Sequence, residues 1–139
     1  MRHLARIRPA SFAAALALFA HSAFACEICI EDQVAATYDF AAVTKAQAAG
    51  RGIMFTAVHG RNAGAPGSAA IIRRTIAAVP EVDQDSIRLS IVPPAASFAW
   101  DPKRHPPGTV LRAINHKLVK NGLALVALRT ENSGRRSPS

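Results

Sequence analysis

The order of hydrophobic patterns from residue 53 onward constrains the fold of this chain more than any other feature. Alternating or continuous apolar runs, which are typical of β-strands, occupy residues 53–58, 86–92, 96–100 and 123–128. Two segments with apolar residues at helical spacing lie between them, one from Ser68 to Val79 and one from Pro107 or Gly108 to Lys120. Pro80 is expected to end the first helix and Asn121-Gly122 the second. The predicted order is therefore strand, helix, strand, strand, helix, strand.

This order is that of an α+β, ferredoxin-like βαββαβ sandwich, in which two helices cover one face of a four-stranded antiparallel sheet. The opposite face of such a sheet needs a cover or remains exposed to solvent. Residues 33–49 are rich in alanine and contain no Gly or Pro, which predicts an extra N-terminal helix that ends at Gly50. This helix is available to cover the second face, although the sequence does not indicate where it docks.

The amino-terminal residues have the three parts of an export signal. Arg2, His3, Arg6 and Arg8 form a basic region, and residues 11–20 form an apolar stretch too short to cross a bilayer as a helix. Small residues in Ala23-Phe24-Ala25 predict cleavage between Ala25 and Cys26, and hence a periplasmic or secreted protein. Two alternatives are a short anchor that stays attached and lipid attachment at Cys26.

Four segments follow from these patterns. They are a signal peptide at 1–25, an N-terminal extension with a helix at 26–50, a ferredoxin-like domain at 51–129 and a disordered polar tail at 130–139. Removing 25 of the 139 residues leaves 114, enough for one domain with a core. The 17 basic residues then fall to 14 against 9 acidic residues, a net charge of +5. A charge of this size favours solubility and does not by itself indicate a nucleic-acid partner.

Cys26 and Cys29 are the only cysteines, and they form one Cys-Glu-Ile-Cys sequence directly after the expected cleavage site. Two thiolates at this spacing can bind one soft ion, and near-linear Cu(I) needs no further ligand, whereas zinc needs two more. Cysteine pairs of exported proteins are also often oxidised to a disulfide. A redox-active pair is the third alternative, disfavoured by the nearby acidic residues Glu27, Glu31 and Asp32, which oppose thiolate formation.

Several segments resemble the heavy-metal-associated (HMA) domain, the small module of copper chaperones and metal-transporting ATPases. The similar segments are Val79-Pro80-Glu81-Val82, Ser86-Ile87-Arg88-Leu89, Ser97-Phe98-Ala99-Trp100-Asp101-Pro102 and Val110-Leu111-Arg112-Ala113-Ile114. The resemblance covers roughly residues 53–129 and implies the ferredoxin-like fold. The family binds its metal through a Cys-x-x-Cys in the loop between the first strand and first helix. Here Ala65 and Ser68 occupy those positions, so the usual family site is absent and its ligands do not transfer to Cys26 and Cys29.

The sequence thus predicts a small, exported, non-enzymatic binding protein with Cys26 and Cys29 as its metal ligands, for Cu(I) or another soft ion. The alternatives are a structural or protein-interaction domain with a Cys26–Cys29 disulfide and, third, an envelope thiol-disulfide oxidoreductase. The expected partners are a metal ion or an envelope protein, with no nucleic acid and no stable membrane insertion after signal cleavage. No catalytic residue is predicted. We interpret five further residues as solvated or surface residues, namely His59, Asp83, Asp85, His105 and His116, and Phe98 and Trp100 as sheet-packing residues.

Overall fold

The computed structural model describes residues 24–132, with side chains from residue 30 onward. Its elements are α1 (Phe24–Thr37), α2 (Phe40–Ala48), β1 (Gly52–Gly60), α3 (Pro66–Ala77), β2 (Val82–Ser90), β3 (Ala95–Trp100), α4 (Pro107–Leu118), the 3-10 helix η1 (Val119–Asn121) and β4 (Leu123–Glu131). After residue 50 the elements follow one another as strand, helix, strand, strand, helix, 3-10 helix and strand. Within the described residues, no helix is long and apolar enough to span a bilayer.

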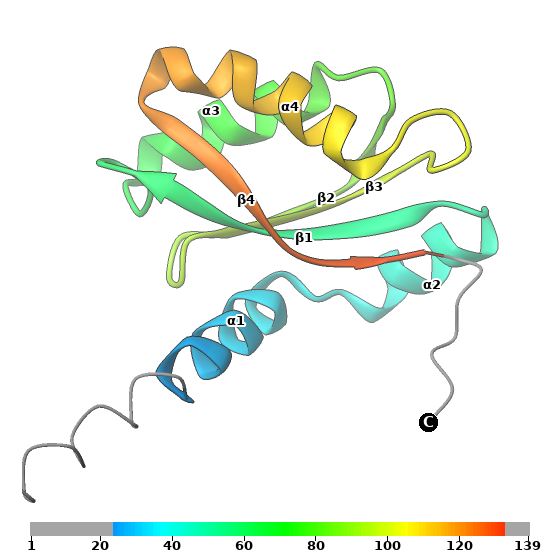
Figure 1. The fold of residues 1–139 in the computed structure, drawn as a ribbon, viewed down its shortest axis with the longest axis horizontal. Helices are drawn as coiled ribbons and strands as arrows, with labels where there is room; N and C mark the ends of the chain where they lie inside the picture. Colours follow the sequence, from blue (N-terminus) through cyan, green and yellow to red (C-terminus); the bar gives the residue numbers. More distant parts are fainter. Residues whose placement is uncertain (1–23, 133–139) are drawn as a thin grey trace, which may run out of the picture.

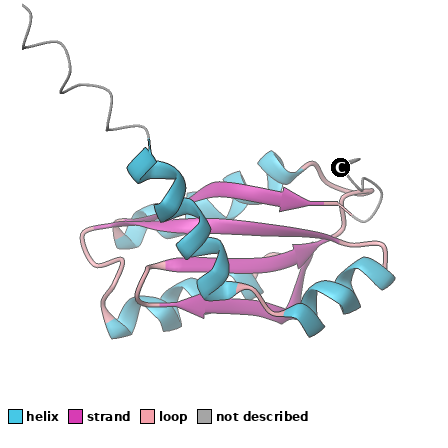
Figure 2. Cartoon of the chain, turned by 90° about the horizontal axis from the view of Figure 1, so that it is seen from below, coloured by secondary structure: helices cyan, strands magenta, loops and turns pink. Residues whose placement is uncertain are grey.

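The four strands form one antiparallel sheet in the order β2-β3-β1-β4. Helices α3 and α4 lie on one face of this sheet, and α1 and α2 lie on the other (Figure 1). Seen from the second face, α1 crosses in front of the strands (Figure 2). The chain is therefore an α+β protein with three layers, and its central strands β1 and β3 are covered on both sides.

The larger core lies between the sheet and the α3/α4 layer. Predicted helix stripes are confirmed there, because Ile72 and Ile76 of α3 and Ile114 of α4 are almost completely buried. Residues that face them from the sheet include Met54, Val58, Phe98 and Trp100. The indole Nε1–H of Trp100 donates to the carbonyl oxygen of His105 at 3.1 Å, which satisfies the one polar group of this ring. The interpretation of Phe98 and Trp100 as packing residues is thus confirmed.

A second, smaller core lies on the opposite face. Val34 of α1 and Val43 of α2 pack there with Ile53, Phe55 and Ala99 of the sheet. The N-terminal helical region therefore covers the second face, and the fold has no exposed apolar sheet surface at these positions.

The single helix predicted at 33–49 is wrong in its extent, because two helices occupy this region. α1 begins earlier, at Phe24, and ends at Thr37; α2 begins after Asp39. The carboxylate of Asp39 accepts a hydrogen bond from the backbone N–H of Ala42 at 3.1 Å and caps α2. A hydroxyl from the sheet, Ser97 Oγ, donates to the carbonyl of Thr37 at 3.0 Å. Alanine-rich periodicity did not reveal this break, since both halves continue the same helical pattern.

Helix α3 begins at Pro66, before Ser68, the residue from which the helical pattern was expected to run. Its N-cap is Ala65, and Pro66 is its first residue, where the missing N–H costs nothing. Ser68 is instead buried inside the first turn.

The last strand was expected to be well covered by its neighbours, and this expectation is wrong. β4 lies at the edge of the sheet, and only Leu123 and Leu125 of it are buried. The side chain of Asn115 on α4 bonds both backbone groups of Leu125, accepting from its N–H at 2.7 Å and donating to its carbonyl at 2.9 Å. This contact occupies groups that an edge strand otherwise offers to another chain. β4 also includes Thr130 and Glu131, which the sequence assigned to the tail; the rest of the expected tail, from residue 133, lies outside the described residues.

Two glycines bring β1 and β4 together. Gly122 adopts a left-handed backbone conformation with φ of 65° and ends η1, as the Asn121-Gly122 pattern predicted. Gly60, at the end of β1, has φ of 133°, and a Cβ atom there would overlap the carbonyl oxygen of Gly122. The strands can approach at this point only because residue 60 has no side chain.

Candidate functional site

Cys26 and Cys29 lie in the first two turns of α1. Their side chains are outside the described part of the structure, as is the expected signal sequence through residue 23. Two positions three residues apart on an α-helix have Cα atoms about 5 Å from each other and share one face. The helix therefore brings the two cysteine positions together without any long-range contact.

The sequence placed the cysteine pair ahead of the helix expected at 33–49, whereas the structure places both cysteines within α1. Glu27, Glu31 and Asp32 lie on the same helix, and these carboxylates disfavour ionisation of a nearby thiol.

The helix that carries the cysteines is attached to the sheet at several points. Val34 is buried against the second core, and Ser97 holds the carbonyl of Thr37. Near the middle of α1, the carboxylate of Glu31 lies 3.8 Å from the guanidinium of Arg129 on β4. The same guanidinium lies over the ring of Phe55, 5.5 Å from its centroid. The C-terminal half of α1 is thus fixed to the domain, and the cysteines extend from this fixed half.

The loop at which HMA domains hold their metal has no soft ligand in this chain. The hydroxyl of Ser68 is directed to backbone carbonyls of its own loop, those of Asn62, Ala63 and Ala65. Its contact with the Ala65 carbonyl is 2.6 Å. The Ser68 hydroxyl thus stabilises its own loop by hydrogen bonds to the loop backbone. The oxygen atoms of this loop are hard donors, which do not fit a soft metal ion.

The histidines are dispersed over the described surface. His59 at the end of β1 and His116 on α4 are exposed, as predicted. His105 is half-buried, with Nε2 3.3 Å from a carboxylate oxygen of Glu81, so its interpretation as a simple surface residue is incomplete. It lines a cavity of about 290 Å³ at one end of the sheet, together with Arg51, Pro80, Glu81, Asp101 and Arg104. Among residues with described side chains, no group of three or more His, Cys, Asp or Glu is arranged to hold a metal ion.

Sequence analysis did not identify the ion pair between Asp39 and Arg88. Nε of Arg88 lies 2.8 Å from Oδ2 of Asp39 and connects the α1–α2 junction to β2. The N–H of Ala42 and the guanidinium of Arg88 hold the pKa of Asp39 below its ordinary value, because both favour the ionised carboxylate. The two residues are 49 positions apart. No local pattern could have paired them, although an Asp directly before a helical run is a recognisable N-cap signal.

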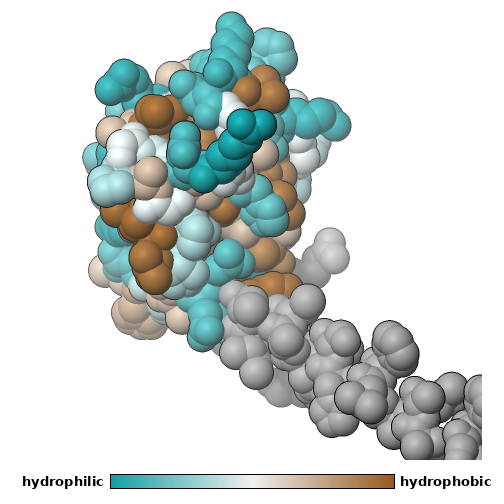
Figure 3. All heavy atoms as spheres, turned by 90° about the vertical axis from the view of Figure 1, so that its left-hand side faces the viewer, coloured by the Kyte–Doolittle hydropathy of each residue, from teal (hydrophilic) through white to brown (hydrophobic). Residues whose placement is uncertain are grey.

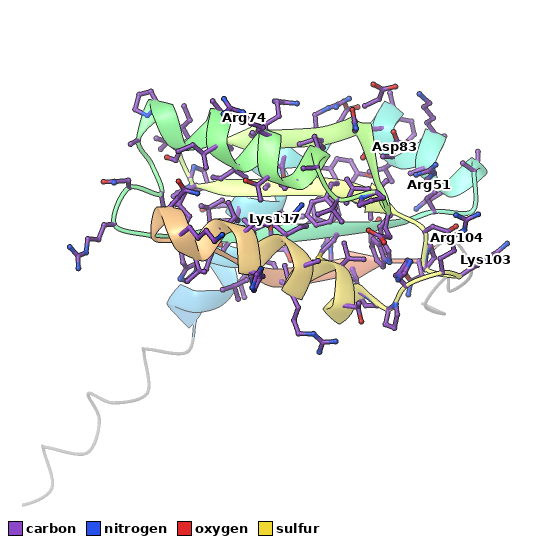
Figure 4. The ribbon with its side chains drawn as sticks, turned by 90° about the horizontal axis from the view of Figure 1, so that it is seen from above. Arg51, Arg74, Asp83, Lys103, Arg104 and Lys117 are labelled. Atoms are coloured by element: carbon purple, nitrogen blue, oxygen red, sulfur yellow. The ribbon has the colours of Figure 1, made fainter. Side chains whose placement is uncertain are left out.

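Asp83 and Asp85 were interpreted as a solvated turn, and the structure places both in β2 instead. The register of β2 against β3 shifts between Asp83 and Arg88, so this part of the strand is irregular. Arg51, just before β1, lies 4.0 Å from Asp83. Figure 4 shows both residues at the same end of the sheet. The two aspartates are thus residues of a strand at the edge of the sheet.

Comparison with known proteins adds no functional assignment to this geometry. No protein-family model, no curated protein and no solved structure matches this chain.

Proposed function

We propose that this chain is a small, exported, non-enzymatic binding protein that holds a soft metal ion, Cu(I) in the first place, through Cys26 and Cys29. The observation that carries the proposal is the position of both cysteines one turn apart on a helix that is docked on the sheet. A helical backbone places positions 26 and 29 one turn apart, so two sulfur donors can converge on one ion at little entropic cost.

The donor set fits Cu(I) better than zinc. Two thiolates complete a near-linear Cu(I) site, whereas zinc binds four ligands in structural sites. Glu27 and Glu31 are the nearest further donors in sequence, and hard carboxylate oxygens do not favour Cu(I). Bound metal would supply the positive charge that stabilises two adjacent thiolates beside these acids.

For the fold, we propose the ferredoxin-like topology with an additional α1–α2 layer. The strand order β2-β3-β1-β4, with a helix between β1 and β2 and another between β3 and β4, supports this assignment. The resemblance to HMA domains is compatible with the same topology. On this view the family's loop site is replaced by a site on the helix that covers the other face.

The test is a titration of the reduced, processed protein with Cu(I) in competition with a chromogenic chelator. We expect one equivalent of Cu(I) to bind, and we expect the Cys26→Ser/Cys29→Ser variant to lose this binding. His59→Asn serves as the matched control, because His59 is the exposed histidine at the end of the strand that leads into the family's metal loop. It should bind Cu(I) as the wild type does. Equal and weak binding by the wild type and the cysteine variant would contradict the proposal.

A second function is favoured by the same helix geometry. A Cα separation of about 5 Å lies within the range that a disulfide requires, so a structural or protein-interaction domain with a Cys26–Cys29 disulfide is the alternative. Protein isolated from an oxidising compartment would then contain no titratable thiol and no metal. An envelope oxidoreductase comes third, and it predicts reduction of insulin disulfides that the metal-binding and structural alternatives do not.

A further inference from the structure

The charges of this protein are divided between its two helical layers. Segments 61–80 and 102–130, which include α3, α4 and η1, contain no Asp or Glu. The helices of these segments carry the cations Arg73, Arg74, Arg112, Lys117 and Lys120, which we call the basic helix layer. On the other side of the sheet, residues 24–48 contain four acids and one base, a net charge of −3. The α3/α4 face is thus positive, whereas two of the four acids on the α1/α2 face, Glu31 and Asp39, are balanced by Arg129 and Arg88.

The cations of the basic helix layer are exposed and lack carboxylate partners. All five side chains are exposed, and none of them forms an ion pair among the described residues. Their polar contacts are with neutral groups; for example, Nζ of Lys117 donates to the carbonyl of Ala78 at 3.2 Å. Four arginines elsewhere do meet carboxylates, namely Arg51, Arg88, Arg104 and Arg129. The charge of the basic helix layer is therefore available to an external anion.

These cations are spread over a broad surface. Figure 4, which views the α3/α4 face directly, shows Arg74 on α3 and Lys117 on α4, with Lys103 and Arg104 beyond one end of the layer. Viewed from one end of the sheet, the space-filling surface carries hydrophilic and hydrophobic areas side by side (Figure 3). Val119, which is 67 % exposed, lies between Lys117 and Lys120 in the chain. Segments that bind the membrane interface combine cations with exposed apolar side chains.

We infer that the basic helix layer docks on a membrane surface that carries anionic phospholipid head groups. A flat membrane surface can contact the cations of both helices at once, and its head groups can rearrange around each cation. An acidic protein would instead need carboxylates at positions that match those of the cations. The division of charge orients the molecule as it approaches, since the surface attracts the α3/α4 face more strongly than the opposite face. In this orientation α1 and its cysteines face away from the membrane. The inference does not depend on what Cys26 and Cys29 bind.

The test is co-sedimentation of the processed protein with vesicles. Binding is expected to vesicles of phosphatidylethanolamine and phosphatidylglycerol but not to vesicles of phosphatidylcholine alone. It should be strong at low ionic strength and lost near 1 M salt, where the Debye length is about 3 Å. Cys26→Ser/Cys29→Ser should bind as the wild type does, which separates this test from the copper titration.

Two variants with the same change in net charge locate the binding surface. Arg74→Gln/Lys120→Gln removes two cations from the basic helix layer and should weaken binding about 25-fold, taking roughly fivefold for each cation. Lys45→Gln/Arg51→Gln removes two cations outside it and should weaken binding less than twofold. Both variants share the wild-type amino terminus, so the difference between their affinities for vesicles reports on the basic helix layer alone. Circular dichroism should confirm that both variants are folded.

Three results would overturn the inference. Failure of the wild type to bind anionic vesicles would exclude membrane docking. Equal losses in the two variants would assign binding to net charge and not to this face. Retention on immobilised polyglutamate without binding to vesicles would identify an acidic protein as the partner instead.

Discussion

Asp39 connects two helices and a strand through one carboxylate. One oxygen caps α2 by accepting from Ala42, and the other accepts from Arg88 on β2. Tyr38, the preceding residue, stacks on Phe55 with the ring centroids 6.1 Å apart. These contacts of two adjacent residues determine where the helical run breaks and how both halves meet the sheet.

Asp39 should make the stability of the fold depend on pH in the acid range. Folding lowers the pKa of Asp39 from 3.8, so its contribution is fully present above that value and is lost as the pH falls through the lower folded pKa. Asp39→Ala should therefore lower the Tm at pH 7. Asp39→Asn should lower the Tm by a smaller amount, because its amide oxygen still caps the helix. The difference from wild type should shrink in strongly acidic buffer. Thermal unfolding followed by circular dichroism at several pH values measures this.

The control for this series is Asp32→Ala, which removes an exposed carboxylate of α1 that has no partner among the described residues. Its Tm should remain close to that of wild type at every pH. A constant difference between Asp39→Ala and wild type down to the lowest pH would show that the ionised form of Asp39 is not what stabilises the fold.

At the scale of elements, Val34 is the buried apolar side chain among those described in α1. Val34 is 2 % exposed and packs in the second core with Phe55 and Ala99. Val34→Ala should lower the free energy of unfolding by about 2 kcal/mol, because two buried methyl groups are removed and the site cannot fully collapse. Urea unfolding gives this value.

Val126→Ala makes the same chemical change on β4, where Val126 is 45 % exposed. It should change the free energy of unfolding by less than about 0.5 kcal/mol. If Val34→Ala cost no more than Val126→Ala, α1 would not be an integral cover of the sheet.

The elements that the sequence predicted well are those with a strong local period. The stripes of Ile72 and Ile76 and of Val110 and Ile114 specified α3 and α4, and the Asn121-Gly122 stop was correct. The prediction was wrong where long-range contacts decide the outcome. The continuous apolar residues of β4 suggested a strand covered by neighbours on both sides, but β4 is an edge strand. The side chain of Asn115 on α4 hydrogen-bonds its free edge at Leu125.

The candidate site was less accessible to prediction than the fold. The spacing of Cys26 and Cys29 was evident, but the helix that carries them was placed too late in the chain. The charge division between the helical layers could have been read from the absence of acids in 61–80 and 102–130. Its meaning required the topology, because only the fold puts these two segments on one face.

At the scale of the whole molecule, one sheet serves both cores, so the two helical layers should unfold together. The single tryptophan, Trp100, reports on the α3/α4 core, and the single tyrosine, Tyr38, reports on the other face through its stacking on Phe55. We expect Trp100 fluorescence and Tyr38 derivative absorbance to change at the same urea concentration. Far-ultraviolet circular dichroism should give the same midpoint and serves as the control. A lower midpoint for Tyr38 alone would instead show that α1 and α2 detach before the rest of the domain unfolds.

The contact between Gly60 and Gly122 has a consequence for how this sequence can vary in evolution. Any substitution at residue 60 places an atom against the backbone of Gly122, whereas a Cβ atom added at Gly67 or Gly108 would enter open space, so those two glycines can be replaced freely. Natural relatives should therefore retain glycine at position 60 even where their cysteines, surface charges and helix lengths have diverged. We expect glycine at position 60 to be a more durable marker of common descent than the cysteine pair.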